Sequence, residues 1–253
     1  MTSRSSRWAT LLVTFAGIGL PWLFARKAPD ANDPAAQLLT FLPAPYASVI
    51  WAPIYTGLLI FAVWQARAAC VENTRVAAVR PWLMLSAVLN AAWFGAVALR
   101  HPGWTVPIVF AMLVVALVMH QAGQIGRAAS SAGEAWLRLP FSLYVGWLIV
   151  TAFTTVSTEL ARIGWDGFGW SPITWGIVWI VASSIVGLIA RFQLDDPVVG
   201  AVFVWTYLAI IVQQQQSPLV SLFAGLAAVL FLLSLFVRDR QTPRSTHSEC
   251  AEV

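Results

Sequence analysis

The sequence predicts an all-α polytopic membrane protein with eight transmembrane helices. Apolar residues make up 59% of its 253 residues, charged residues only 10%, and the mean hydropathy is +0.74. Soluble domains are typically about 45–50% apolar and cover their surfaces with charge. The composition therefore excludes a soluble enzyme, a nucleic-acid-binding protein and a disordered regulator, and it makes the lipid bilayer the first expected partner.

Eight apolar segments approach the roughly 20 residues that a helix needs to cross a bilayer core. They lie at approximately 8–25, 45–66, 81–99, 104–120, 138–158, 172–190, 197–213 and 217–237. The first segment ends at Arg26 and Lys27 without a small-residue cleavage site, so we expect a retained helix and not a signal peptide. Pro197 and Pro218 open the last two segments, where a missing N–H costs little.

Basic residues predict the orientation of these helices. With eight spans, one side of the membrane holds 11 of the 15 Lys and Arg residues and the other side holds 4. Merging the last two spans would give 8 and 7 and erase the asymmetry. The positive-inside rule therefore favours eight spans, with both termini in the cytoplasm.

The polar residues exclude several functions. All eleven carboxylates fall in loops, tails or span ends, which argues against a proton-coupled pump. Lys27, the only lysine, lies outside the first span, so a retinal Schiff base has no amine. His101, His120 and His247 lack a partner at helical spacing, and we expect them at the interface or in the tail. We expect no catalytic residue, no metal site and no disulfide between Cys70 and Cys250.

Tryptophan is unusually abundant, with 14 residues. Nine are predicted at span ends or in loops, where an aromatic belt at the headgroups accounts for them: Trp8, Trp22, Trp64, Trp82, Trp104, Trp136, Trp165, Trp170 and Trp175. Five fall inside spans: Trp51, Trp93, Trp147, Trp179 and Trp205. A buried indole N–H needs an acceptor that lipid does not offer, so we expect these five rings to face protein or a cavity.

Three interior pairs combine aromatic and polar side chains at helical spacing. They are Trp51 with Tyr55, Asn90 with Trp93, and Tyr144 with Trp147. An amide inside a span needs a partner on another helix or on a ligand. The pairs therefore indicate either contacts between helices or a ligand pocket, and the residue pattern leaves both interpretations open.

The order of these pairs resembles the TspO/MBR family of tryptophan-rich sensory or translocator proteins. W-x-x-x-Y, L-N-x-x-W-F and Y-x-x-W follow one another with one plainer helix between, and Pro43 and Pro45 precede Trp51. The resemblance covers approximately residues 8–160 and implies a five-helix bundle with a cavity for porphyrins or other flat hydrophobic molecules. It implies that the cavity is lined by Trp51, Tyr55, Asn90, Trp93, Tyr144 and Trp147.

The resemblance predicts a longer bacterial variant of that family. Residues 1–7 form a cytoplasmic tail, 8–160 the five-helix module, 161–237 a three-helix extension and 238–253 a polar tail. The leading hypothesis is a protein that binds, carries or senses a tetrapyrrole-like ligand, with a porphyrin as possible bound ligand and no other cofactor. The alternatives are an accessory membrane subunit and a tetrapyrrole-degrading membrane enzyme. A homodimer is left open.

Overall fold

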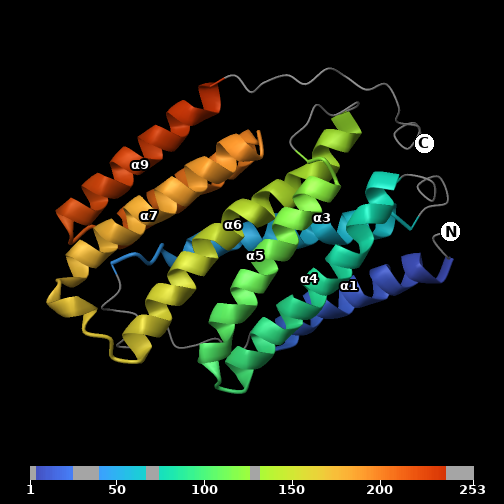
Figure 1. The fold of residues 1–253 in the computed structure, drawn as a ribbon, viewed down its shortest axis with the longest axis horizontal. Helices are drawn as coiled ribbons and strands as arrows, with labels where there is room; N and C mark the ends of the chain where they lie inside the picture. Colours follow the sequence, from blue (N-terminus) through green and yellow to red (C-terminus); the bar gives the residue numbers. More distant parts are fainter. Residues whose placement is uncertain (1–3, 25–39, 67–73, 126–131, 238–253) are drawn as a thin grey trace.

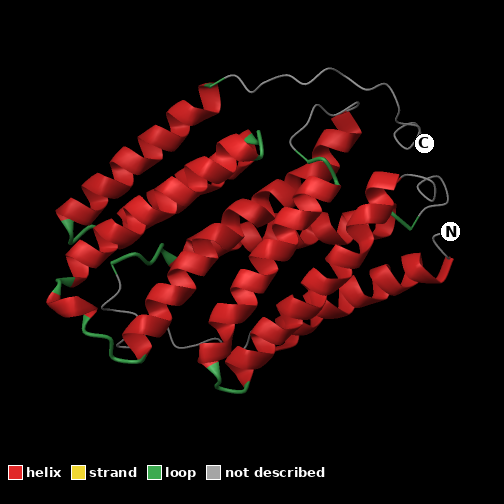
Figure 2. Cartoon of the chain, viewed as in Figure 1, coloured by secondary structure: helices red, strands yellow, loops and turns green. Residues whose placement is uncertain are grey.

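The fold is taken from a computed structural model that describes residues 4–24, 40–66, 74–125 and 132–237. Within these ranges the chain is helical and contains no strand (Figure 2). The α-helices are α1 (Arg4–Phe24), α3 (Trp51–Trp64), α4 (Thr74–Ala98), α5 (Thr105–Ala122), α6 (Ala132–Arg162), α7 (Pro172–Gln193), α8 (Pro197–Gln213) and α9 (Pro218–Phe236). Short 3-10 turns are η2 (Pro45–Ile50), η4 (Pro102–Trp104) and η5 (Gly167–Gly169). Cys70, Cys250, His247, the 238–253 tail and most of the loop after α1 lie outside the described residues.

Each predicted span corresponds to one helix, but several helices begin earlier than predicted. α4 starts at Thr74 and α6 at Ala132, not at 81 and 138, and α1 starts at Arg4 within the predicted tail. Arg80, just before the predicted span 81–99, and Arg138, at the start of the predicted span 138–158, are both helical and buried. A helix can extend beyond its apolar segment because arginine packs its aliphatic stem against neighbours while its charged head finds polar partners.

The protein is a multi-pass membrane protein. Six helical segments are long and apolar enough to cross a bilayer: Pro45–Trp64, Arg75–Ala98, Pro102–Ala122, Arg138–Arg162, Pro172–Gln193 and Pro218–Phe236. Two further apolar helical segments, Arg7–Ile18 and Pro197–Gln213, are shorter. That these two shorter helices also cross the membrane, as the predicted count of eight requires, stays a prediction.

Helix α6 forms the centre of the bundle. It contacts α3, α5, α7 and α8, while α1 packs on α4 and α3, and α9 packs on α8 and α7. Figure 1 shows α1 and α4 at one end of the arrangement and α7 and α9 at the other, with α6 between them. About 61% of the apolar stretch of α6 is buried, against 28–33% in the other long segments, so α6 is the most deeply buried of the long helices.

The last three helices are packed into the same bundle. A Cβ on Gly146 of α6 would lie 3.0 Å from Val202 of α8, so the two helices meet where one has no side chain. The chain just before and within η2 is bound to α7 and α8 by three hydrogen bonds. They are Thr40 Oγ1 to the Pro172 carbonyl (2.6 Å), Ala44 N–H to the Ala209 carbonyl (3.1 Å), and Trp205 Nε1 to the Ala47 carbonyl (3.2 Å).

The outer surface of the bundle is apolar. Large aliphatic side chains are exposed on α7 and α9, among them Ile185, Ile189, Leu222, Leu226 and Leu233. Trp8, Trp104 and Trp170 are also exposed near helix ends, as expected for an aromatic belt. A surface of this kind fits contact with lipid chains.

Candidate functional site

The structure brings four of the six predicted site residues into ring contact. Trp51 stacks on Tyr55 with ring centroids 4.8 Å apart, and its edge meets Tyr144 at 6.2 Å and Trp147 at 6.3 Å. We call Trp51, Tyr55, Tyr144 and Trp147 the aromatic group. Their spacing on α3 and α6, i to i+4 and i to i+3, puts each pair on one helix face.

Helix α4 supplies the polar partners of the aromatic group. The Tyr55 hydroxyl donates to Asn90 Oδ1 at 3.1 Å, and the Tyr144 hydroxyl lies 2.9 Å from Ser86 Oγ. Asn90 is thus held by a residue of another helix, as an amide inside a span requires. Sequence reasoning missed Ser86, although its i, i+4 spacing to Asn90 marks a polar face on α4.

Trp93, the sixth predicted residue, lies one turn beyond Asn90 and packs edge-on against Phe94 at 5.0 Å. The indole nitrogens of Trp93 and Trp147 are both buried without a hydrogen-bond partner among the described residues. A buried donor left unpaired costs about 1–3 kcal/mol. The site therefore carries two donors that an acceptor on a ligand would satisfy.

The other two interior tryptophans belong to the contact between α7–α9 and the rest of the bundle. Trp179 meets Phe153 of α6 at 6.1 Å. The Trp205 ring is 38% exposed, so our expectation that it faces protein was wrong for the ring, but its N–H does find the Ala47 carbonyl.

A buried polar cluster around Ser142, in the first half of α6, was not predicted. Asp196 Oδ2 lies 2.8 Å from His120 Nε2 and accepts a hydrogen bond from Ser142 Oγ at 2.5 Å, while Asp196 Oδ1 accepts from the Val198 N–H that begins α8. We call His120, Ser142 and Asp196 the polar joint, because it links α5, α6 and α8. His120 lies in the last turn of α5 and is 1% exposed, and its partner comes from another helix and not from a neighbour at helical spacing.

The charge of the polar joint depends on its hydrogen bonds. Burial raises the pKa of Asp196, but the bonds from His120 and Ser142, the nearby imidazole and the Val198 N–H together hold that pKa below its ordinary value. The joint is not a nucleophilic triad, because Ser142 and His120 both bind the same carboxylate oxygen and not each other. Among the described residues, no group of three or more His, Cys, Asp or Glu side chains is placed to hold a metal ion.

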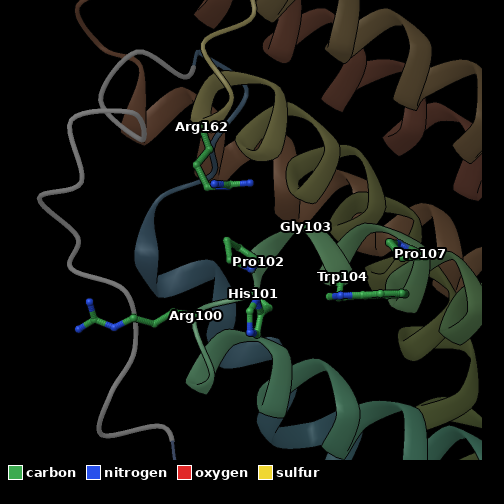
Figure 3. A pocket seen from close by; sticks show the side chains of 7 residues that line it. All are labelled: Arg100, His101, Pro102, Gly103, Trp104, Pro107 and Arg162. Carbon is green, nitrogen blue, oxygen red and sulfur yellow. The ribbon is translucent and has the colours of Figure 1, made fainter.

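A pocket opens where α4 turns into α5, beside the end of α6 (Figure 3). It has a volume of about 540 Å³ and is lined by Arg100, His101, Pro102, Gly103, Trp104, Pro107 and Arg162, which we call the rim pocket. On α6, Trp147 precedes Arg162 by 15 residues, about 22 Å of helix rise, so the rim pocket lies well beyond the aromatic group, at the end of α6.

Comparison with known families gives one finding. The sequence model of a family described as TSPO-like protein matches residues 8–237. No curated protein and no solved structure matches the chain. The matched range extends past the 8–160 on which the motifs depend, so the last three helices fall within the family pattern.

Proposed function

Because the chain belongs to the TSPO-like family, we propose that it binds a flat hydrophobic ligand of the porphyrin type against the aromatic group, as a carrier or sensor. One observation supports this most directly. The indole N–H groups of Trp147, whose ring meets Trp51 edge-on, and of Trp93, one helical turn past Asn90, are buried and have no hydrogen-bond acceptor among the described residues. The proposal places the protein in the inner membrane, with both termini in the cytoplasm.

The chemistry of the aromatic group fits such a ligand. Indole and phenol rings offer flat faces on which a planar conjugated molecule stacks. The Asn90 oxygen accepts from Tyr55 and the Asn90 side chain also hydrogen-bonds the Tyr144 hydroxyl, so the donors of this site that lack an acceptor among the described residues are the two indole N–H groups. The group is therefore rich in donors, and it suits a flat molecule that carries hydrogen-bond acceptors.

The alternative, an accessory subunit in which these residues only pack, fits the unpaired donors poorly. Packing selects residues whose polar atoms are satisfied within the protein, since each buried orphan lowers stability. Phenylalanine at positions 93 and 147 would give similar ring contacts without that cost. The two tryptophans therefore favour a binding role.

The test replaces each of the two tryptophans with phenylalanine, which removes the indole N–H and keeps an aromatic ring. In lipid nanodiscs we expect Trp147→Phe and Trp93→Phe to keep or raise the thermal stability of the ligand-free protein, because each removes an unpaired donor. Both should weaken porphyrin affinity about fivefold to tenfold, measured by absorbance titration, because an acceptor on the bound ligand loses its hydrogen bond from the protein.

Trp175→Phe is the matched control. Its Nε1 donates to the Gly167 carbonyl at 2.8 Å, so this variant should lose stability and keep its affinity. The proposal fails if the unmodified protein shows no saturable porphyrin binding. It also fails if the affinities of all three variants equal that of the unmodified protein.

A further inference from the structure

The rim pocket lies where three membrane-spanning segments reach the edge of the bilayer. The span Arg75–Ala98 ends just before it, the span Pro102–Ala122 begins in it, and the last residue of the span Arg138–Arg162 lines it. A Cβ on Gly103 would approach Glu159 Oε1 to 3.3 Å, so the α4–α5 connection touches the last turns of α6. The pocket is therefore at the depth of the lipid headgroups, which flank the hydrocarbon core that the three spans cross.

Basic and hydrogen-bond-donating side chains line the pocket, and none of its lining residues is acidic. Glu159, behind the lining, accepts from Nε and one Nη of Arg162, which orients the guanidinium and leaves its second Nη free of Glu159. Figure 3 shows the Arg162 guanidinium above His101 and Trp104. The Arg100 side chain extends away from them, so it adds positive charge at the outer edge of the pocket. The pocket thus offers a guanidinium, an imidazole and an indole N–H to an anion.

The backbone of the α4–α5 connection also favours an anion. The turn is fixed by its own hydrogen bonds, from the His101 N–H to the Ala96 carbonyl and from the Arg100 N–H to the Val97 carbonyl. η4 then passes directly into α5, and no described side chain caps the start of this 18-residue helix. Since the first N–H groups of a helix lack partners within it, the positive end of the α5 dipole lies at the pocket.

An exposed apolar strip leads from the pocket along α5. Pro107 lines the pocket, and Phe110 and Val114 follow it at i+3 and i+7, which places the three on one helix face. All three side chains are exposed, Phe110 by 47% and Val114 by 59%. Seven residues of helix rise about 10 Å, so this α5 strip runs from headgroup depth into the hydrocarbon region. A polar pocket that continues into an apolar strip fits a molecule with a charged head and an apolar chain.

We infer that the rim pocket binds the phosphate of an anionic phospholipid, with one acyl chain along the α5 strip. The arginine fork matches the geometry of a phosphate, to which it donates parallel hydrogen bonds. A net negative headgroup is favoured over a zwitterionic one, because choline would bring a second positive charge beside Arg162. The inference does not depend on the proposed function, since Trp147 lies about 22 Å from Arg162 along α6.

The experiment compares two lipids on the full chain in a non-ionic detergent. Native mass spectrometry measures the affinity for the first lipid bound, and phosphatidylglycerol should bind about fivefold more tightly than phosphatidylcholine. Arg162→Gln should weaken phosphatidylglycerol binding about threefold to fivefold and affect phosphatidylcholine less. Arg100→Gln should act in the same direction but more weakly, because its side chain extends away from the pocket. High salt should reduce the preference for the anionic lipid.

Two controls separate direct contact from net charge. Replacing both Glu159 and Arg162 by glutamine keeps the net charge, yet phosphatidylglycerol binding should still fall because the guanidinium is gone. Arg75→Gln removes one charge at the opposite end of α4 and should leave both affinities unchanged. Thermal unfolding checks that every variant stays folded. Equal affinity of the unmodified protein for the two lipids, or full phosphatidylglycerol affinity in either variant that lacks Arg162, would overturn the inference.

Two further measurements test the acyl chain and the source of the phosphate. Phe110→Ala should weaken binding of both lipids about twofold to threefold, because it removes apolar surface from the α5 strip. Phe15→Ala removes a ring of similar exposure (45%) from α1 and should change neither affinity. Equal effects of these two variants would overturn the placement of the chain. Water-soluble glycerol 3-phosphate should not displace the lipid, and displacement at the concentrations at which phosphatidylglycerol binds would assign the pocket to a free phosphate instead.

Discussion

Two aromatic centres of this protein differ in whether their polar atoms have hydrogen-bond partners. In the α7–α9 region the Tyr207 hydroxyl lies 3.0 Å from Ser183 Oγ and 2.7 Å from Ser184 Oγ, and Phe203 stacks on Phe231 at 4.6 Å. In the aromatic group, by contrast, the Trp147 N–H has no partner within the described chain. A core that satisfies its own polar atoms is structural, whereas a core with unused donors is prepared for another molecule.

The two regions are joined at both ends of the bundle. The polar joint connects them at the end where α5 finishes and α8 begins, and Trp205 with Ala47 connects them at the other. If α7–α9 are structural and the aromatic group binds the ligand, changes at these two connections should alter stability. Only changes near the aromatic group should alter binding directly. The following predictions test this, from the largest expected effect to the smallest.

Asp196→Ala should be the most damaging single change. It leaves His120 and Ser142 buried without their shared acceptor and removes the cap of α8. Breaking a buried charged pair by removing one partner costs about 3–5 kcal/mol. We expect a loss of this order in the free energy of unfolding, measured by denaturant titration in detergent micelles.

Asp196→Asn is the graded control for that change. Its side-chain oxygen still caps α8 but carries no charge, so the loss should be clearly smaller. Equal stability of the unmodified, Asn and Ala proteins would show that the polar joint does not hold the two regions together.

Acid should weaken the same joint. The folded-state pKa of Asp196 is lowered from its ordinary value of 3.8, so its contribution is fully present at higher pH and is lost as pH falls through 3.8 toward the lower folded-state pKa. The stability difference between the unmodified protein and Asp196→Asn should therefore be constant above about pH 5 and narrow as the pH falls through 3.8 toward the folded-state pKa. Thermal unfolding at each pH measures it, and a constant difference would contradict the assignment.

Most of the fold follows from the sequence because apolar length and charge placement are local properties. Each of the eight predicted segments became a helix, and the Trp51–Tyr55 and Tyr144–Trp147 pairs share helix faces because spacing alone decides that. The direct contact between Trp51 and Trp147 required α3 to lie against α6, which the resemblance to a known family anticipated and the periodicity did not.

The polar joint could not be predicted from the sequence. His120, Ser142 and Asp196 come from three separate helices, and no local pattern connects them. Asp196 before Pro197 does indicate a helix start, which the structure confirms, but the burial of that carboxylate depends on how α5 and α6 pack. The same holds for Arg80, which is buried where Gln65, the residue that caps the end of α3, accepts its Nε hydrogen bond at 2.8 Å.

A matched pair of tyrosines compares the two centres directly. Tyr207→Phe and Tyr144→Phe remove the same hydroxyl from buried hydrogen bonds with serines, so each should cost about 1 kcal/mol of unfolding free energy. Only Tyr144→Phe should weaken porphyrin binding, because Tyr144 belongs to the aromatic group. Loss of affinity in Tyr207→Phe with Tyr144→Phe unaffected would reverse the comparison and move the site into α7–α9.

The smallest effect is expected at the second connection between the regions. Trp205→Phe keeps a ring beside Tyr46, now 5.5 Å away and edge-on, and removes only the N–H that donates to the Ala47 carbonyl. Only one neutral hydrogen bond is removed and a ring is kept, so we expect a loss of about 0.5 kcal/mol in the free energy of unfolding, the low end of the net contribution of such a bond. Ala47 lies in η2, directly before Trp51, so this bond also steadies the start of α3. Porphyrin affinity should therefore fall by less than twofold, in contrast to the fivefold to tenfold loss expected for Trp147→Phe. A larger loss of affinity in Trp205→Phe than in Trp147→Phe would mean that α8, and not the aromatic group, controls binding.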